Sequence, residues 1–297
     1  EKHPAGDSIT MSLKPHKALQ SIVLVVCCCC LSSCASLITS TVIKPAVGNL
    51  QQQTDIKLVC EGAPSYLLML DSMLVSSPDS EGLLLVATQS YSAYAAALEE
   101  CGGTEERVAA IAKKAHFYGH SLLDHYLPLQ DAPDQGALDR ALASLKTSDV
   151  PEVFWGTYGW LTWVKSQKGS PASIADMVQI QKIMARLLEL DESYQGGSIH
   201  LFFGMYYAAK PAMFGGDPER STFHFEKALA LSDRKFLPVQ TIYAEMLARM
   251  TMDKELHDSL LQEVLTFPEE DAPEFGLSNQ MAKKKAKRLL DENYFGE

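Results

Sequence analysis

Basic residues are scarce in this chain of 297 residues, which has 26 lysines and arginines against 37 aspartates and glutamates and a net charge of −11. Nucleic-acid binding depends on a basic patch that displaces counterions from the phosphate backbone, so the composition excludes a general nucleic-acid binder. The 14 prolines and 18 glycines are too few and too dispersed for a low-complexity protein. The hydrophobic content of 46% therefore predicts a folded body.

The motifs of common catalytic sites are also missing. No serine lies in a Gly-x-Ser-x-Gly elbow, and no glycine-rich phosphate loop follows a strand pattern. Carboxylate pairs such as Glu99-Glu100 and Glu269-Glu270 lie at predicted helix ends or in acidic loops, where solvation explains them. We therefore predict that the protein is not an enzyme and needs no cofactor.

His116 and His120 are the best candidates for metal ligands, because a separation of four places both on one face of a predicted helix. The residue after His116 is Phe117, so the general-base glutamate of a zinc protease is missing. A closed zinc site needs four ligands, and no cysteine lies nearby in the sequence. No metal site is predicted, and the histidines are interpreted as ordinary buried or surface side chains.

Cysteine is absent after residue 101, and five of the seven cysteines lie near the start of the chain. These five end an apolar run that begins near Leu19 and follows Lys14 and Lys17. A short apolar run behind a cationic flank is typical of a secretory signal peptide, and this run is shorter than the roughly 20 residues that cross a bilayer. The clustered cysteines are Cys27, Cys28, Cys29, Cys30 and Cys34.

Leu31-Ser32-Ser33-Cys34 matches the bacterial lipobox, which predicts that Cys34 is lipidated and becomes the mature first residue. Residues 1–33 are then an export segment, and residues 1–10 precede Met11 and are a candidate upstream extension. An uncleaved anchor or a buried apolar helix is the alternative. We expect a periplasmic protein attached to a membrane through its lipid, with the inner membrane favoured.

Two further segments follow the export segment. Residues 34–58 are rich in serine, threonine and glutamine and are predicted to be a flexible leash. Residues 59–297 are predicted to form one all-α domain, because apolar residues recur at helical spacing and no strand pattern is convincing. Cys60 and Cys101 belong to the exported part, where a disulfide is allowed, and their pairing is left open.

The helices match the tetratricopeptide template loosely. Trp155 and Gly159 have the spacing of its first helix, where the glycine lets a neighbouring helix approach, and Gly204 with Tyr207 repeats the glycine and aromatic pair. The interval between the two glycines exceeds the template's period of about 34 residues. We therefore predict antiparallel helix pairs in an irregular, tetratricopeptide-like superhelix with a concave binding face.

Gly215-Gly216-Asp217-Pro218-Glu219 predicts a helix start, with Asp217 as the cap and Pro218 in the first turn. Together with the lipobox, Phe203-Gly204, His224-Phe225 and Asn279, this motif resembles the T-component family of tripartite ATP-independent periplasmic (TRAP) transporters, from about residue 56 to residue 295. The resemblance implies an all-α lipoprotein that forms a homotrimer and binds the transporter's periplasmic substrate-binding subunit. It also implies a hydrophobic ligand. Asp217 and Asn279 are predicted to be structural.

Aromatic and methionine side chains gather on or beside the predicted first helices. Most are expected in the core, but a helix with aromatic residues around much of its circumference cannot bury all of them in one stripe. Part of the set is therefore predicted to line an apolar channel, a trimer contact or both. The candidates are Trp155, Trp160, Phe202, Phe203, Tyr206, Tyr207, Met213 and Phe214.

Two points stay open at the level of sequence. The basic run Lys283-Lys284-Lys285 with Lys287-Arg288 is interpreted as a solvated helix face, and a contact with anionic lipid or an acidic partner is the alternative.

The predicted function is an accessory lipoprotein that docks a TRAP substrate-binding subunit and helps to pass a hydrophobic ligand. The alternatives are a generic tetratricopeptide lipoprotein of envelope assembly and a stand-alone carrier of a hydrophobic ligand.

Overall fold

The computed structural model describes residues 44–129, 135–209 and 215–296, and these ranges contain helices and turns but no strand. The prediction of an all-α fold is therefore confirmed for the described residues. The chain divides into Glu1–Pro45 and Ala46–Glu297, and the second unit holds nearly all of the described structure. Cys34, Met213 and Phe214 lie outside the described residues.

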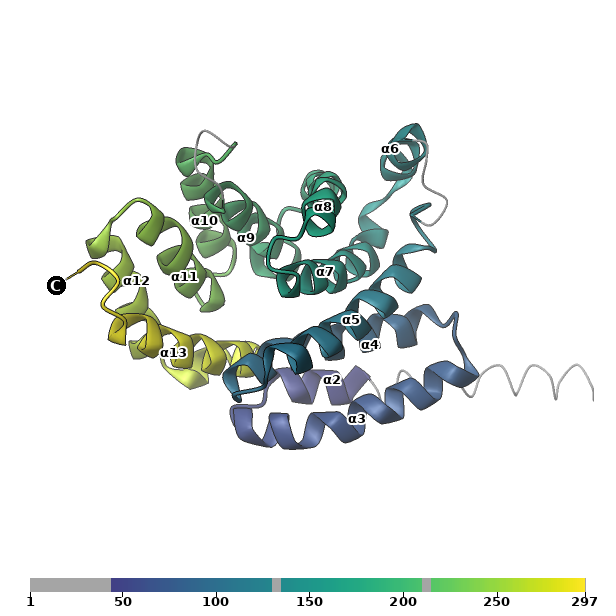
Figure 1. Cartoon of the computed structure of the whole chain (residues 1–297), viewed down its shortest axis with the longest axis horizontal. Coiled ribbons are helices and arrows are strands. Elements are labelled where there is room, and N and C mark those ends of the chain that lie inside the picture. The colour runs from purple at the N-terminus through teal and green to yellow at the C-terminus, as the bar shows by residue number, and fades with distance from the viewer. Residues whose placement is uncertain (1–43, 130–134, 210–214, 297) are drawn as a thin grey trace, which may run out of the picture. The chain divides into compact units, whose positions relative to one another are not determined.

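The helices of the second unit follow one another with short connections (Figure 1). A π-helical turn, Ala244–Ala248, continues α11. The α-helices are α2 (Lys44–Gln51), α3 (Ile56–Ser76), α4 (Glu81–Glu100), α5 (Glu105–Leu123), α6 (Gln135–Ser144), α7 (Val150–Ser166), α8 (Pro171–Leu190), α9 (Tyr194–Ala208), α10 (Pro218–Leu231), α11 (Pro238–Tyr243), α12 (Lys254–Thr266) and α13 (Gly276–Asp291).

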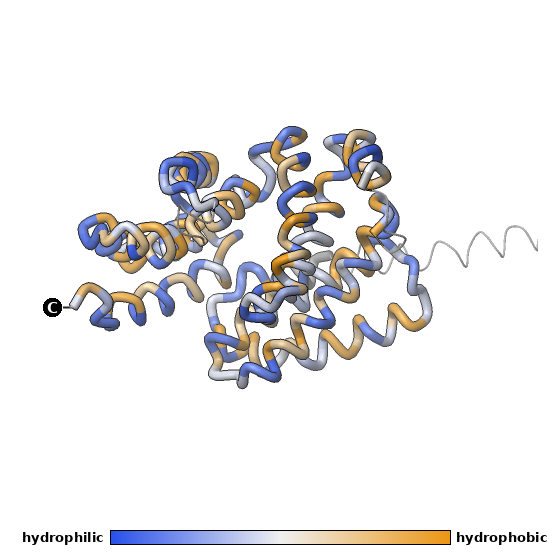
Figure 2. Tube along the Cα trace, turned by 45° about the horizontal axis from the view of Figure 1, so that its top comes forward, coloured by the Kyte–Doolittle hydropathy of each residue, from blue (hydrophilic) through white to orange (hydrophobic). Residues whose placement is uncertain are grey.

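Helices that are neighbours in the chain are mostly neighbours in space. From α7 to α13 each helix packs against the next, and α3, α4, α5 and α7 form a similar series. The last helix, α13, also contacts α3 and α4 (Figure 1). Hydrophobic and hydrophilic residues alternate along the helices (Figure 2), as burial of one side requires. The tetratricopeptide-like superhelix stays a prediction.

The helical body begins earlier than the sequence predicted. Helix α2 lies inside segment 34–58, which was expected to be a leash, and α3 starts at Ile56. Asp55 explains the start of α3, because its side chain accepts a hydrogen bond from the Leu58 backbone N–H at 3.0 Å. The serine, threonine and glutamine content of the segment obscured this cap.

Glycines bring α5 and α7 into backbone contact. A Cβ atom on Gly159 would lie 2.6 Å from the Ala115 carbonyl oxygen, and a Cβ atom on Gly119 would lie 2.6 Å from the Gly156 carbonyl oxygen. On α9, a Cβ atom on Gly204 would lie 2.9 Å from the Phe225 ring. The structure thus confirms that the template-matching glycines permit close approach of helices.

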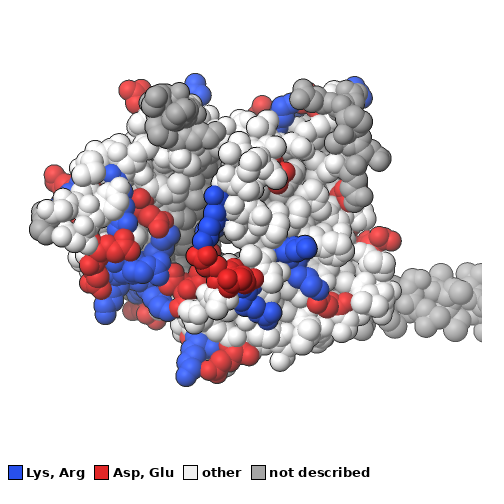
Figure 3. Space-filling view, in the orientation of Figure 1, with Lys and Arg blue, Asp and Glu red and all other residues white. Residues whose placement is uncertain are grey.

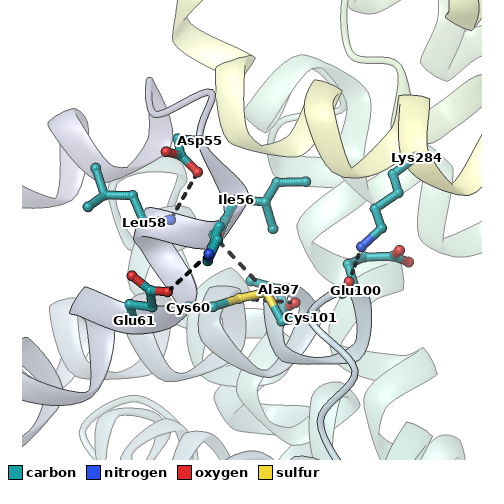
Figure 4. The surroundings of a disulfide bond; sticks show 10 residues. Asp55, Ile56, Leu58, Cys60, Glu61, Ala97, Glu100, Cys101 and Lys284 are labelled. Atoms are coloured by element: carbon teal, nitrogen blue, oxygen red, sulfur yellow. Dashed lines mark hydrogen bonds and ion pairs between the residues drawn. A yellow bond between two sulfur atoms is a disulfide. The ribbon is translucent and has the colours of Figure 1, made fainter.

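A disulfide joins Cys60 of α3 to Cys101, the residue that follows α4 (Figure 4). Their Cα atoms are 6.6 Å apart, which lies within the range of natural disulfides. The pairing that the sequence left open is therefore present. It connects the first half of α3 to the end of its packing partner.

The two family-matching polar residues have structural roles, as predicted. Asp217 caps α10 by accepting a hydrogen bond from the Arg220 backbone N–H at 3.0 Å. Asn279 is buried in α13 and bonds the turn before α11, because it accepts from the Leu237 N–H and donates to the Lys235 carbonyl oxygen, both at 3.0 Å. These bonds tie α13 to the preceding helices.

Most of the basic run on α13 is engaged in contacts within the chain. Arg288 pairs with Glu100 at 3.1 Å, Lys283 lies 3.6 Å from Glu269, and Lys284 donates to the Glu100 carbonyl oxygen. Lys285 pairs with a glutamate of the π-helical turn. Basic and acidic side chains are intermixed on this part of the surface (Figure 3). The contacts of Lys284 and Arg288 with Glu100 connect α13 to α4, so the run is more than a solvated face.

Asp71 on α3 connects three helices. Its Oδ1 atom accepts from the hydroxyls of Tyr91 on α4 at 2.8 Å and Tyr118 on α5 at 2.6 Å, and its Oδ2 atom accepts from Lys114 at 2.8 Å. Burial raises the pKa of the Asp71 carboxyl, but these hydrogen bonds and the lysine charge outweigh burial and lower it below its usual value. The ionised carboxylate therefore stabilises this junction.

We expect Asp71→Asn to lower the free energy of unfolding by about 1–2 kcal/mol at pH 7, because an amide cannot accept all three hydrogen bonds. A folded-state pKa below the ordinary value of about 3.9 stabilises the fold above that pH, and the contribution is lost as the pH falls through the lower pKa. Urea unfolding should therefore show the full difference at pH 7 and a progressively smaller one as the pH falls below the ordinary carboxyl pKa of about 3.9. Glu61→Gln on the same helix is the control, since the exposed Glu61–Lys57 pair should change stability by less than about 0.5 kcal/mol.

Candidate functional site

The predicted aromatic set separates into core and half-buried members. Trp160, Phe202 and Phe203 are buried, with 3–4% of their surface exposed, and belong to the core between α5, α7, α8 and α9. Trp155, Tyr206 and Tyr207 pack against the same core but are only partly buried. These last three are the predicted candidates among the described residues that a partner or ligand can reach.

The reachable candidates do not form one patch. Trp155 lies beside Phe154, whose ring centroid is 5.1 Å from that of Tyr194 at the start of α9. Tyr206 and Tyr207 lie at the other end of α9, beyond the non-helical residues Gln195, Gly196 and Gly197 that follow Tyr194. The structure therefore assigns Trp155 and the two tyrosines to different regions.

Side chains of α10 complete the tyrosine region. Phe223 is 55% exposed, and its ring centroid is 5.2 Å from that of His224. The His224 ring stacks on Tyr207 at 5.8 Å, and Tyr206 packs against Tyr207 at 5.4 Å. We call Tyr206, Tyr207, Phe223 and His224 the α9–α10 aromatic surface.

Hydrogen bonds and a cation hold this surface in place. The Asp217 backbone N–H donates to the Tyr207 carbonyl oxygen at 3.1 Å and so joins the end of α9 to the start of α10. Arg220 in the first turn of α10 places its guanidinium carbon 5.5 Å from the centre of the Tyr207 ring. A cation over a tyrosine face is stabilising and leaves the arginine near the surface.

His224 of this surface pairs with the buried His200 of α9. The Nδ1 atoms of His200 on α9 and His224 on α10 are 2.9 Å apart, so one ring donates and the other accepts. Burial, together with the nearby His200 and Arg220, lowers the pKa of His224 to about 4. Burial also lowers the pKa of His200, against the opposing effect of Glu192 at 3.2 Å. Both rings are therefore neutral near pH 7, which keeps the surface apolar.

The histidines that the sequence placed on one helical face do lie together. The rings of His116 and His120 are 4.2 Å apart, and Trp163 stacks on His116 while Trp160 packs edgewise on His120. Burial lowers the pKa of His116 to about 4 and also lowers that of His120. Among the described residues, no three histidine, cysteine, aspartate or glutamate side chains are placed to hold a metal ion. The pair is part of the α5–α7 packing.

Sequence reasoning missed Phe223 as a surface residue. The buried face of α10 consists of Ser221, Phe225, Ala228 and Leu229. Phe223 is two residues from both Ser221 and Phe225, and in a helix this spacing places it away from the buried face. The spacing could therefore have predicted that Phe223 is exposed. Its exposure makes the α9–α10 aromatic surface suited to recognition by contact.

Comparison with known proteins gives this arrangement a family. Residues 52–295 match the family model described as TRAP transporter T-component. A protein of Treponema pallidum (strain Nichols), described only as uncharacterized, is 23% identical over 257 residues, which cover 80% of this chain and 79% of that protein. The family match spans α3 to α13 and therefore the core, the glycine contacts and the α9–α10 aromatic surface. The chain belongs to the TRAP transporter T-component family.

Proposed function

We propose that this T-component docks the periplasmic substrate-binding subunit of a TRAP transporter through the α9–α10 aromatic surface. The observation that supports the proposal is the exposed Phe223 ring, which packs on His224, whose own ring stacks on the half-buried Tyr207. Members of this family are accessory, non-enzymatic components of a transporter, so we place the surface in that role. Docking brings a loaded binding subunit close to the membrane part of the transporter.

The chemistry of the surface suits a protein partner. Tyrosine and arginine are enriched among the residues that dominate binding energy at protein interfaces. The Tyr207 ring contacts the rings of Phe203 and His224 and the guanidinium of Arg220, so its position is set before a partner arrives. Binding then costs little conformational entropy.

The remaining predictions about assembly belong to the same proposal. Residues 1–33 direct export, Cys34 carries the lipid, and the body faces the periplasm from the inner membrane. The body is a single domain in which the helix pairs form a tetratricopeptide-like superhelix, and three copies assemble. Sedimentation equilibrium of the purified protein tests the trimer, and mass spectrometry of the mature chain tests the lipid on Cys34.

Binding to a purified TRAP substrate-binding subunit from the same organism tests the docking surface. We expect Phe223→Ala to raise the dissociation constant about tenfold, because a central aromatic contact is lost. This equals a loss of about 1.4 kcal/mol of binding free energy. Phe117→Ala is the matched control, since Phe117 is 63% exposed on α5, away from the α9–α10 aromatic surface. Isothermal titration calorimetry measures both variants.

Equal binding by the wild type and Phe223→Ala would rule out this surface. Absence of binding by the wild-type protein at micromolar concentration would rule out the docking function itself. Passage of a hydrophobic ligand is a separate part of the proposal, suggested by the half-buried Trp155 beside the α7–α9 core. Lipid-like adducts in native mass spectra of the purified protein are expected if ligand passage is correct.

A further inference from the structure

Helix α3 has two apolar faces, although only one of them is packed. The buried face contacts α4 and consists of Val59, Ala63, Leu67, Leu70 and Leu74. The opposite face, which we call the outer face of α3, contains large apolar side chains in solvent. They are Leu58 at 53% exposure, Leu68 at 67%, Met69 at 44% and Val75 at 84%.

The outer face is poor in charge. Its charged residues, Lys57 and Glu61, lie in the first two turns and pair with each other at 3.8 Å. Beyond them the exposed positions are glycine, serine, leucine, methionine and valine. Figure 3 shows charged side chains near one end of α3 and mostly uncharged surface along its lower edge. A soluble helix normally has polar residues on this side, so packing inside the unit does not explain the sequence.

An apolar hollow between α2 and α3 continues this surface. It has a volume of about 190 Å³ and is lined mainly by apolar atoms of both helices. Leu58 and Gly62 belong both to the hollow and to the outer face, and nothing lies within 4 Å of where a Gly62 side chain would begin. The lining residues from α2 and its connection are Asn49, Leu50 and Gln53.

Helix α3 is long and apolar enough to cross a bilayer by length and composition, with a mean hydropathy of 1.3. Its buried face argues against a crossing orientation, because the Cys60–Cys101 disulfide and the hydrogen bonds of Asp71 attach it to α4 and α5. Crossing would put Asp71 and its partners into hydrocarbon, which is costly. A helix fixed on one side and apolar on the other suits the surface of a membrane.

We infer that the outer face of α3 lies on the lipid bilayer, with Leu58, Leu68 and Val75 in the boundary between headgroups and acyl chains. The inference rests on the proposed lipid at Cys34. Pro45 is eleven residues beyond Cys34, a distance of at most about 40 Å even for a fully extended chain. The tether keeps α3 near the bilayer at an effective concentration of the order of millimolar, so weak apolar contacts suffice.

This placement gives the body an orientation. In Figure 1 the second unit has α3 along its lower edge and α10 near its upper edge. When α3 lies on the bilayer, α10 therefore lies on the side of the second unit that is away from the membrane. The membrane contact and the proposed docking surface can therefore be occupied at the same time.

Quenching by brominated lipids tests the contact in the mature chain, residues 34–297. Cys34 is coupled through its thiol to a maleimide phospholipid in phosphatidylethanolamine and phosphatidylglycerol vesicles, because Cys60 and Cys101 are paired. A tryptophan is introduced by Leu68→Trp, and its matched control is Val178→Trp, an exposed apolar position at 58% on α8. The emission of the three native tryptophans is subtracted with the wild-type chain.

We expect brominated vesicles to reduce the added emission of Leu68→Trp about twofold or more and to leave that of Val178→Trp unchanged, because quenching needs insertion below the headgroups. Val75→Trp, at an 84% exposed position, is the second variant and should behave like Leu68→Trp. Equal quenching at positions 68 and 178, or none at positions 68 and 75, would overturn the inference.

A second copy of the chain is the competing occupant of the outer face. Sedimentation equilibrium of the uncoupled chain without vesicles distinguishes the two, because self-association that Leu68→Asp abolishes would assign the face to another copy and overturn the inference. An association that Leu68→Asp leaves unchanged supports the membrane contact. Chemical coupling replaces natural lipidation and no binding subunit is present, so failure here is distinguishable from failure of the docking proposal.

Discussion

Alanine in place of Gly119 is expected to lower the free energy of unfolding by about 2 kcal/mol or more. The new Cβ atom would lie 2.6 Å from the Gly156 carbonyl oxygen and 3.5 Å from the Gly159 Cα atom. Both neighbours are backbone atoms of α7, so no side chain can rotate away and the two helices must separate. The loss exceeds the gain of about 1 kcal/mol that alanine brings to a helix interior.

Gly62→Ala is the control for this substitution. Gly62 also lies within a helix, but no atom lies within 4 Å of its Cβ position. Alanine there should raise stability by about 0.5–1 kcal/mol, because the unfolded chain loses conformational freedom and no contact is strained. Urea unfolding of both variants measures the contrast. Similar values for Gly119→Ala and Gly62→Ala would mean that the α5–α7 contact is not close.

The glycine contacts show how far the sequence predicts the packing. Gly159 and Gly204 were identified from their spacing to an aromatic residue, and both do lie against a neighbouring helix. Gly119 and Gly156 belong to the same kind of contact but match no template position. Periodicity predicts which face of a helix is buried, whereas the pairing of two small residues depends on where the helices cross.

The candidate site was predicted less well for a related reason. Phe202, Phe203, Tyr206 and Tyr207 spread over more of the circumference of α9 than one narrow stripe covers, and periodicity does not decide which of them are exposed. Phe202 and Phe203 are buried because α9 contacts α8, α10 and α11. The number of neighbours around a helix is a property of the tertiary fold. The exposed aromatic residue of this region, Phe223, lies on α10 instead.

For helix α3 the sequence does not decide whether its second apolar face is buried or exposed. Large apolar residues on two opposite faces are typical of a helix buried on both sides or of one in contact with lipid. The structure shows that the side bearing Leu68 and Val75 is exposed, which the sequence alone could not decide. Asp71 was equally hidden in the sequence, because its three donors come from α4 and α5.

Loss of the Cys60–Cys101 disulfide is expected to cost about 4 kcal/mol of unfolding free energy, the largest single effect predicted for this protein. The two cysteines are 41 residues apart, and closing a loop of that length removes about this much conformational entropy from the unfolded chain. We expect Cys60→Ser with Cys101→Ser to show the loss in urea unfolding at pH 7. Dithiothreitol should produce the same loss in the wild-type protein.

The double variant is its own control for the reductant, because dithiothreitol should leave its stability unchanged. A loss below about 1 kcal/mol would contradict the prediction. It would mean that the disulfide restricts the unfolded chain far less than the length of its loop implies. Hydrogen exchange locates the effect. Without the disulfide, amides near Cys60 should exchange faster, while those near Asp71 stay protected, because the hydrogen bonds of Asp71 still attach the second half of α3 to α4 and α5.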